Sequence, residues 1–159
     1  MHKIKVSLGN IPEAIKEIEE YERRLNENIR EFLARLLETG VEIAKAKITE
    51  LGAIDNGELL NSIAYTLYKE GDKGILFTDC SHACYVEFGT GVKGSNSPHP
   101  TMPWAYDVNN HGEDGWYYYD TEQGRVRFTK GMPSRPFMYE TVSELEREAI
   151  EIAKEVFAR

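Results

Sequence analysis

A long run of apolar residues at helical spacing constrains this chain more than any other feature. Between residues 12 and 51, two stripes recur at intervals of three and four residues, the period of an amphipathic helix. The first stripe comprises Ile15, Ile18, Leu25, Ile29, Phe32, Leu36 and Ile43, and the second, which takes over in the later half, comprises Leu33, Leu37, Val41, Ala44, Ile48 and Leu51. The sequence therefore predicts one long helix over residues 12–51.

The length of this helix sets the shape of the molecule. At ~1.5 Å per residue it would reach roughly 60 Å, more than the diameter of a domain of this size. We therefore expect one end to project, or the helix to bend, with Gly40 as the natural place for a bend. Because the early stripe is near a coiled-coil seam, it is expected to pack on the C-terminal helix of its own chain or of another chain.

The remaining sequence predicts short strands and a second helix. Period-two patterns indicate strands at residues 61–69, 75–78, 116–120 and 125–129, with a weaker signal at residues 3–8. Residues 83–88 fit either a strand or a short buried helix. Residues 89–115 are rich in glycine and proline, lack periodicity and are expected to form a long mobile loop.

These elements together define an α+β fold class. A helical pattern over residues 137–158 ends the chain. We expect a single domain over residues 1–159, in which an antiparallel sheet of about four strands occupies residues 59–130 between the two helices.

Composition and charge exclude several classes of protein. The chain has 19 Lys and Arg against 27 Asp and Glu, a net charge of −8. Proteins that grip nucleic acid or anionic membranes need a basic face, so both classes are disfavoured. No run approaches the ~20 apolar residues that span a bilayer, and two cysteines do not make a secreted disulfide scaffold. We expect a soluble protein made inside the cell.

A metal site is one alternative reading of the polar residues. Cys80, His82 and Cys84 lie close together in sequence, and His99 and His111 follow in the predicted loop. Their spacing is not that of the common zinc fingers, and a second cysteine pair is missing. Small buried thiols and surface histidines would explain the same residues. A disulfide between the two cysteines is excluded in a strand but stays open in a helix.

Catalysis has weaker support in the sequence. A Gly-x-Ser-x-Gly nucleophile motif is missing, and neither cysteine has a protease signature. Paired carboxylates can perform acid–base chemistry, and acids are scattered through the loop and its exit: Asp107, Glu113, Asp114 and Asp120. Scattered acids in a wet loop are more typical of a solvated surface, so we expect no enzyme activity, with a small hydrolytic domain as an alternative.

Aromatic residues are dense after residue 103. Trp104 and Tyr106 precede the run Trp116-Tyr117-Tyr118-Tyr119. Such residues are enriched at protein interfaces, although ordinary sheet packing would also use them. Because side chains alternate across a strand, two of the four consecutive aromatics must face outward.

Two segments are more specific than these patterns. They are Tyr85-Val86-Glu87-Phe88-Gly89-Thr90-Gly91 and Gly131-Met132-Pro133-Ser134-Arg135-Pro136-Phe137-Met138-Tyr139. In this order they resemble the tail-component family of long-tailed phages and prophages, whose members are called head–tail joining, tail-completion or minor capsid/tail proteins. The resemblance extends over about residues 20–158, and segments 96–100, 104–109 and 115–118 look like the version in prophages of Gram-positive bacteria.

The resemblance implies a non-enzymatic structural subunit of the virion neck without a cofactor or bound metal. It implies a ring, with six copies expected, that joins the head-connector and tail-tube proteins after assembly in the host cytoplasm, while DNA only passes through its lumen. A dimeric helical adaptor is a further alternative. The residues expected to form the structural motif or subunit interface are Tyr85, Glu87, Phe88, Gly89, Thr90, Gly91, Trp104, Trp116, Pro133, Arg135, Pro136 and Phe137.

The residues of the two segments also support a specific contact. Pro133 and Pro136 restrict the backbone around Arg135, so its guanidinium would be well placed to bind a carboxylate. Glu87 is the obvious acceptor. We therefore hypothesise a Glu87–Arg135 ion pair, within one subunit or between two.

Overall fold

The computed structural model describes residues 10–69, 71–107, 109–121 and 123–158, so the strand predicted at residues 3–8 lies outside the described residues. The helices are α1 (Ile11–Glu50), α2 (Glu58–Ser62), α3 (Ala83–Phe88), α4 (Gly91–Asn96) and α5 (Phe137–Phe157). The strands are β1 (Ile63–Leu67), β2 (Gly74–Thr78), β3 (Trp116–Asp120) and β4 (Arg125–Thr129). This arrangement confirms the predicted α+β class.

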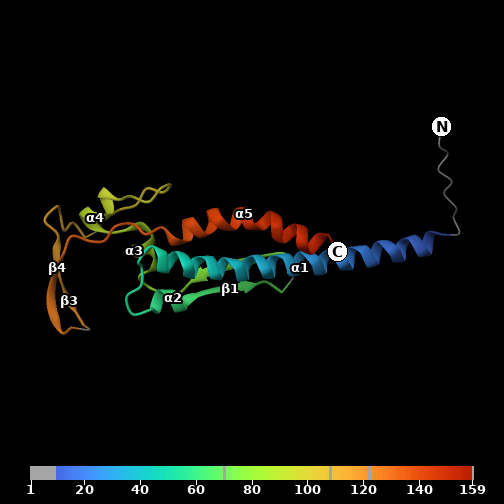
Figure 1. The fold of residues 1–159 in the computed structure, drawn as a ribbon, viewed down its shortest axis with the longest axis horizontal. Coiled ribbons are helices and arrows are strands. Elements are labelled where there is room, and N and C mark those ends of the chain that lie inside the picture. The colour runs from blue at the N-terminus through green and yellow to red at the C-terminus, as the bar shows by residue number, and fades with distance from the viewer. Residues whose placement is uncertain (1–9, 70, 108, 122, 159) are drawn as a thin grey trace.

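Helix α1 is continuous over 40 residues and projects beyond the rest of the molecule (Figure 1). Pro12 lies in its first turn, where the missing N–H costs little. Its buried residues all lie in the later half: Leu37, Gly40, Ile43, Ala44 and Ile48. The first three residues of the early stripe, Ile15, Ile18 and Leu25, are exposed, so only the second half of α1 contributes to the core.

Gly40 lies where α1 is packed on two sides. A Cβ at this position would lie 3.2 Å from Leu76 of β2 and 3.3 Å from Leu145 of α5. The helix runs through Gly40, and this glycine allows the strand and α5 to approach α1 closely.

Helix α5 packs antiparallel along α1 (Figure 1). Near its start, Glu144 forms an ion pair with Lys47 at 3.1 Å, and near its end Glu155 lies 3.5 Å from Arg35. The ring centroids of Phe157 and Phe32 are 6.1 Å apart. Because α5 ends beside Phe32, no helix of the described residues lies along the part of α1 before about residue 28 (Figure 1).

The four strands form two separate antiparallel hairpins, β1–β2 and β3–β4, rather than the single sheet that we expected. Each five-residue strand pairs along its whole length. Residues 79–115 contain α3 and α4, and they carry β3 away from β2. As a result, β1–β2 packs on α1, whereas β3–β4 lies at the opposite end of the molecule from the projecting part of α1 (Figure 1).

The hydrophobic core joins α1, α2, α3 and the start of α5. Its fully buried members include Ala44, Ile48 and Phe137. Residues 83–88, which fitted two structures in sequence, form a helix because Ala83 and Val86 can then face this core together. The segment predicted as an aperiodic loop contains the short helix α4.

Candidate functional site

The two sequence segments that carry the family resemblance lie against each other. Thr90 and Met132 form an antiparallel bridge, in which each backbone N–H donates to the other residue's carbonyl, at 2.9 and 3.1 Å. Arg135 N–H donates to Val86 O at 2.9 Å, and the Ser134 hydroxyl donates to Glu87 O at 2.6 Å. We call the contact between residues 85–91 and 131–139 the motif junction.

Glycines allow the backbones of the motif junction to approach so closely. Gly89 has φ of 81°, and a Cβ there would lie 2.6 Å from Ser134 N. Gly131 has φ of 88°, and its Cβ would collide with Thr90 O. Both residues combine a left-handed backbone with a lack of space, so only glycine fits either position.

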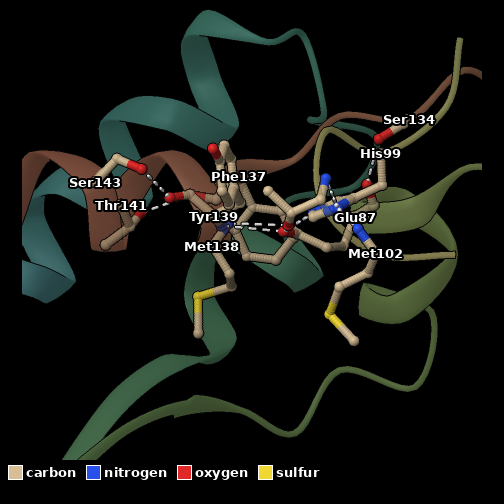
Figure 2. Close-up of polar contacts among 10 residues, drawn as sticks. Glu87, His99, Met102, Ser134, Phe137, Met138, Tyr139, Thr141 and Ser143 are labelled. Carbon is tan, nitrogen blue, oxygen red and sulfur yellow. Dashed lines mark hydrogen bonds and ion pairs between the residues drawn. The ribbon is translucent and has the colours of Figure 1, made fainter.

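Glu87 is the central polar residue of the motif junction (Figure 2). Its side chain is buried, and its carboxylate accepts the backbone N–H groups of Met138 at 2.9 Å and Tyr139 at 3.0 Å. These donors lie in the first turn of α5, whose own N-cap residue, Pro136, makes no side-chain cap. Glu87 therefore caps α5 from a distant segment and places a negative charge at the positive end of the helix.

His99 completes the contacts of this carboxylate. Its Nδ1 accepts the N–H groups of Thr101 and Met102, both at 3.3 Å, so the other ring nitrogen carries the proton. That Nε2–H donates to Glu87 Oε1 at 3.2 Å. His99 thus links the 97–102 segment to the start of α5.

The hypothesised Glu87–Arg135 pair is wrong within the described chain. Both Glu87 oxygens are directed to α5 and His99, and the ion pairs found among the described residues do not include Arg135. The first turn of α5 supplies free backbone N–H groups to the buried Glu87 carboxylate. An Arg135 guanidinium in the same place would have to lose its hydration, which costs free energy. Arg135 binds the first segment through its backbone instead.

The predicted aromatic residues flank the motif junction. Phe88 stacks on Trp104, with ring centroids 4.5 Å apart, and also contacts the His99 ring at 4.7 Å. The Trp104 indole N–H is buried without a partner among the described residues. Trp116 stacks on His111 at 4.4 Å, and its ring fills the space beside Gly91.

Of the other predicted residues, Phe137 is 1% exposed and belongs to the core, and Tyr85 is exposed on α3. Pro133 and Pro136 are half-buried in the segment that leads to α5. Sequence reasoning considered His99 as a metal ligand or a surface histidine, but its side chain is buried. Its flanking residues Pro98 and Pro100 were the signal that its backbone is held in place.

The residues considered for a zinc site are largely separated. His99 binds Glu87, His111 binds Asp107, and Cys84 is an exposed free thiol. Among the described residues, one group of three possible ligands remains, Cys80, His82 and Glu58, whose ligand atoms lie within 4.8 Å of one another. The Cys80 sulfur is 3.2 Å from both nitrogens of His82, so neither nitrogen is singled out as a ligand.

Two of the predicted acids, Asp107 and Asp120, have structural contacts, whereas Glu113 and Asp114 are exposed. The Asp120 carboxylate forms an ion pair with the Arg127 guanidinium, at 3.1 Å, across the β3–β4 hairpin. Asp107 accepts the N–H groups of His111 at 2.7 Å and Gly112 at 2.8 Å, and it also contacts the His111 ring. The hydrogen bonds from the His111 and Gly112 backbone hold the pKa of Asp107 below its ordinary value of 3.8.

This lowered pKa gives a testable pH dependence. The contacts of Asp107 with the His111 and Gly112 backbone contribute stability above pH 3.8, and this contribution is lost as the pH falls through the lower folded-state pKa of Asp107. In an NMR titration, the amide signals of His111 and Gly112 should shift with a midpoint below 3.8 and should not show this transition in Asp107→Asn. A midpoint at or above 3.8 would contradict the assignment.

Two exposed apolar surfaces lie away from the motif junction. In β3–β4, Tyr117 pairs with Phe128 and Tyr119 with Val126, so all four side chains lie on one side of the hairpin. Their exposed fractions are 74%, 49%, 62% and 64% respectively. We call these four residues the hairpin face. Tyr117 and Tyr119 therefore face outward as expected, and Tyr118 on the other side of β3 is exposed as well, so three of the four consecutive aromatics are exposed.

The second surface is on the projecting part of α1. Ile11, Ile15, Ile18 and Tyr21 recur at helical spacing and are 44–65% exposed. We call these four residues the helix tip. An apolar surface left uncovered at each end of an elongated chain is typical of a protein that functions in an assembly.

The chain is thus an elongated α+β protein with an exposed apolar surface at each end (Figure 1). Residues 13–89 match the family HK97-gp10_like, described as "Bacteriophage HK97-gp10, putative tail-component". This match confirms the resemblance to a phage tail-component family over α1, α2, β1–β2, α3 and residues 85–89 of the motif junction. Neither the curated proteins nor the solved structures gave a match.

The part of the chain that the structure describes contains no helix with the length and apolar character needed for a membrane span.

Proposed function

We propose that this protein is a ring-forming structural subunit of the virion neck that joins the head connector to the tail tube. The observation that carries the proposal is the presence of an exposed apolar surface at each end of the molecule, the hairpin face and the helix tip. When two different surfaces of one chain bind each other in successive copies, the contact repeats and can close into a ring. The tail-component family is consistent with this role.

The chemistry of the site agrees with a structural role. Glu87, the buried carboxylate, uses its oxygens to hold α5 and His99 in place. A net charge of −8 suits a channel wall, because like charges keep passing DNA from adhering. In this proposal the partners are other copies of the chain, with six expected, together with connector and tail-tube proteins, and assembly takes place in the host cytoplasm.

Native mass spectrometry of the tag-free protein over a wide concentration range tests the ring. We expect a closed oligomer, a hexamer above all, to form as the concentration rises. A monomer at every concentration would contradict self-assembly into a ring. A stable dimer without larger species would favour a dimeric helical adaptor, and zinc retained in the same spectra would favour a metal-binding domain at Cys80, His82 and Glu58.

Binding to purified connector and tail-tube proteins tests the joining role separately. We expect the oligomer to bind both partners and to link them in one complex, which size-exclusion chromatography would detect. An oligomer that binds only one of them would place the protein at one end of the neck and would contradict the joining function.

A further inference from the structure

We propose that Glu58, Cys80 and His82 form a zinc site, in which one Zn²⁺ ion cross-links the start of α2 to the turn between β2 and α3. A carboxylate oxygen of Glu58, the Cys80 sulfur and a ring nitrogen of His82 lie within 4.8 Å of one another. The site belongs to the fold of a single subunit. It therefore goes beyond the proposed function and does not depend on it.

The distance between the Cys80 sulfur and the His82 ring fits a shared metal ion. Zinc bonds are about 2.3 Å long to sulfur and about 2.0–2.1 Å long to nitrogen, so two such ligands of one tetrahedral ion lie about 3.5 Å apart. The Cys80 sulfur is 3.2 Å from each nitrogen of His82. A small shift would bring either nitrogen to its binding distance, and the exposed Glu58 side chain can rotate to supply the third ligand.

A hydrogen bond between Cys80 and His82 does not account for this contact. A thiol that donates to an imidazole points at the lone pair of one nitrogen, so that nitrogen would lie nearer than the other. The two distances are equal instead. Among the described residues, the Cys80 sulfur has no other polar contact, and the Glu58 carboxylate forms no hydrogen bond or ion pair. No competing partner within this part of the chain occupies the three groups.

The backbone around the three ligands is held in place by the fold. Cys80 is 8% exposed and belongs to the hydrophobic core, and its N–H donates to Thr78 Oγ1 at 3.2 Å. The hydroxyls of Thr78 and Ser62 are 2.6 Å apart, which links the end of β2 to α2. At the start of α2, the Glu58 N–H donates to Asn56 Oδ1 at 3.0 Å. Ligands on a fixed backbone bind a metal with a smaller loss of conformational freedom.

The chemistry of the donors favours zinc. Thiolate, imidazole and carboxylate are all zinc ligands, whereas Mg²⁺ and Ca²⁺ prefer oxygen ligands alone. When the sulfur–zinc bond forms, the Cys80 thiol releases its proton to water. The thiolate and the Glu58 carboxylate then balance the charge of Zn²⁺, and His82 binds as a neutral ring. The site is thus neutral beside the core, with its fourth position open to water.

Zinc titration of the tag-free, chelator-treated full chain tests the site. We expect one Zn²⁺ per chain, measured by competition with a chromogenic chelator, and a higher thermal unfolding temperature with zinc, since an ion that binds only the folded state stabilises it. Glu58→Gln and His82→Ala should each weaken zinc binding by at least about tenfold, because loss of even an outer-sphere partner costs about 10–100-fold. The matched control is Glu113→Gln, at an exposed acid outside the cluster, which should bind zinc as the original protein does.

Cobalt substitution identifies the sulfur ligand. Co²⁺ bound to a thiolate absorbs in the near ultraviolet by charge transfer from sulfur, and its visible bands report tetrahedral coordination. The chain has two cysteines, and Cys84 lies outside the cluster. We expect the charge-transfer band to persist in Cys84→Ser, which assigns the band to Cys80 without altering the buried thiol. Loss of the band in Cys84→Ser would overturn the site.

The outcomes separate the zinc site from the proposed function. Less than one zinc per chain, or equal zinc affinity in Glu58→Gln, His82→Ala and Glu113→Gln, would overturn the site and leave the ring to be judged by its oligomeric state. Zinc bound to a protein that stays monomeric would support the site and the alternative of a metal-binding domain. Zinc bound to a closed ring would support both proposals.

Discussion

Replacing Glu87 with alanine should lower the free energy of unfolding by about 3 kcal/mol or more, since removal of a buried partner leaves each donor with a penalty of about 1–3 kcal/mol. The donors are the N–H groups of Met138 and Tyr139, at the first turn of α5, and Nε2–H of His99. Urea denaturation followed by far-ultraviolet circular dichroism measures this loss.

Two further variants identify the cause of the Glu87 effect. Glu87→Gln keeps one acceptor oxygen but removes the charge at the helix N-terminus, so its loss should be intermediate. Glu146 is an exposed glutamate of α5. The free energy of unfolding of Glu146→Ala should stay within about 0.5 kcal/mol of that of the original protein. If Glu87→Ala were as stable as Glu146→Ala, the capping role of Glu87 would be wrong.

Replacing Gly131 with alanine should cost about 3 kcal/mol, because a left-handed backbone accounts for about 1–2 kcal/mol and a steric collision adds to it. The added Cβ would meet Thr90 O, at the bridge that joins the two segments of the motif junction. Thermal unfolding and urea denaturation of the full chain measure the cost.

Gly112 is the matched control for Gly131. It also has a left-handed backbone, with φ of 72°, but a Cβ there would have nothing within 4 Å. Gly112→Ala should therefore cost only the backbone term, about 1 kcal/mol. Equal losses for the two variants would mean that the close approach at the motif junction contributes nothing beyond backbone conformation.

Local periodicity predicted the two long helices and the four strands, but it missed α2 and α4, and the strand predicted at residues 61–69 is shorter because residues 61–62 belong to α2. The helix predicted over residues 12–51 is α1, Ile11–Glu50, because spacings of three and four leave few alternatives over so many turns. The strands at residues 116–120 and 125–129 have the predicted bounds, since a short turn containing Gly124 fixes their pairing. The arrangement of the strands was not predictable in this way, because a period of two does not say which strands share a sheet.

The candidate site was located from sequence but its contacts were not. The two segments identified Glu87 and Arg135 as important, and opposite charge made their pairing the simplest hypothesis. Glu87 instead binds the N–H groups of Met138 and Tyr139, which every sequence possesses and no side-chain pattern reveals. The role of His99 depends on a loop segment folding back on α5, a tertiary contact that leaves no periodic signal.

Because α1 is uninterrupted, its residue count fixes how far its projecting part reaches and which way its apolar stripe faces. Each residue of a helix adds about 1.5 Å along the axis and turns the next side chain by about 100°. Removing seven residues from the projecting part would shorten its reach by about 10 Å and keep the remaining apolar stripe facing nearly the same way. Removing five would turn that stripe toward the opposite side. Reach and direction at the far end of this chain are therefore set by residue count, and relatives that differ in the length of this helix should differ in steps that preserve its phase.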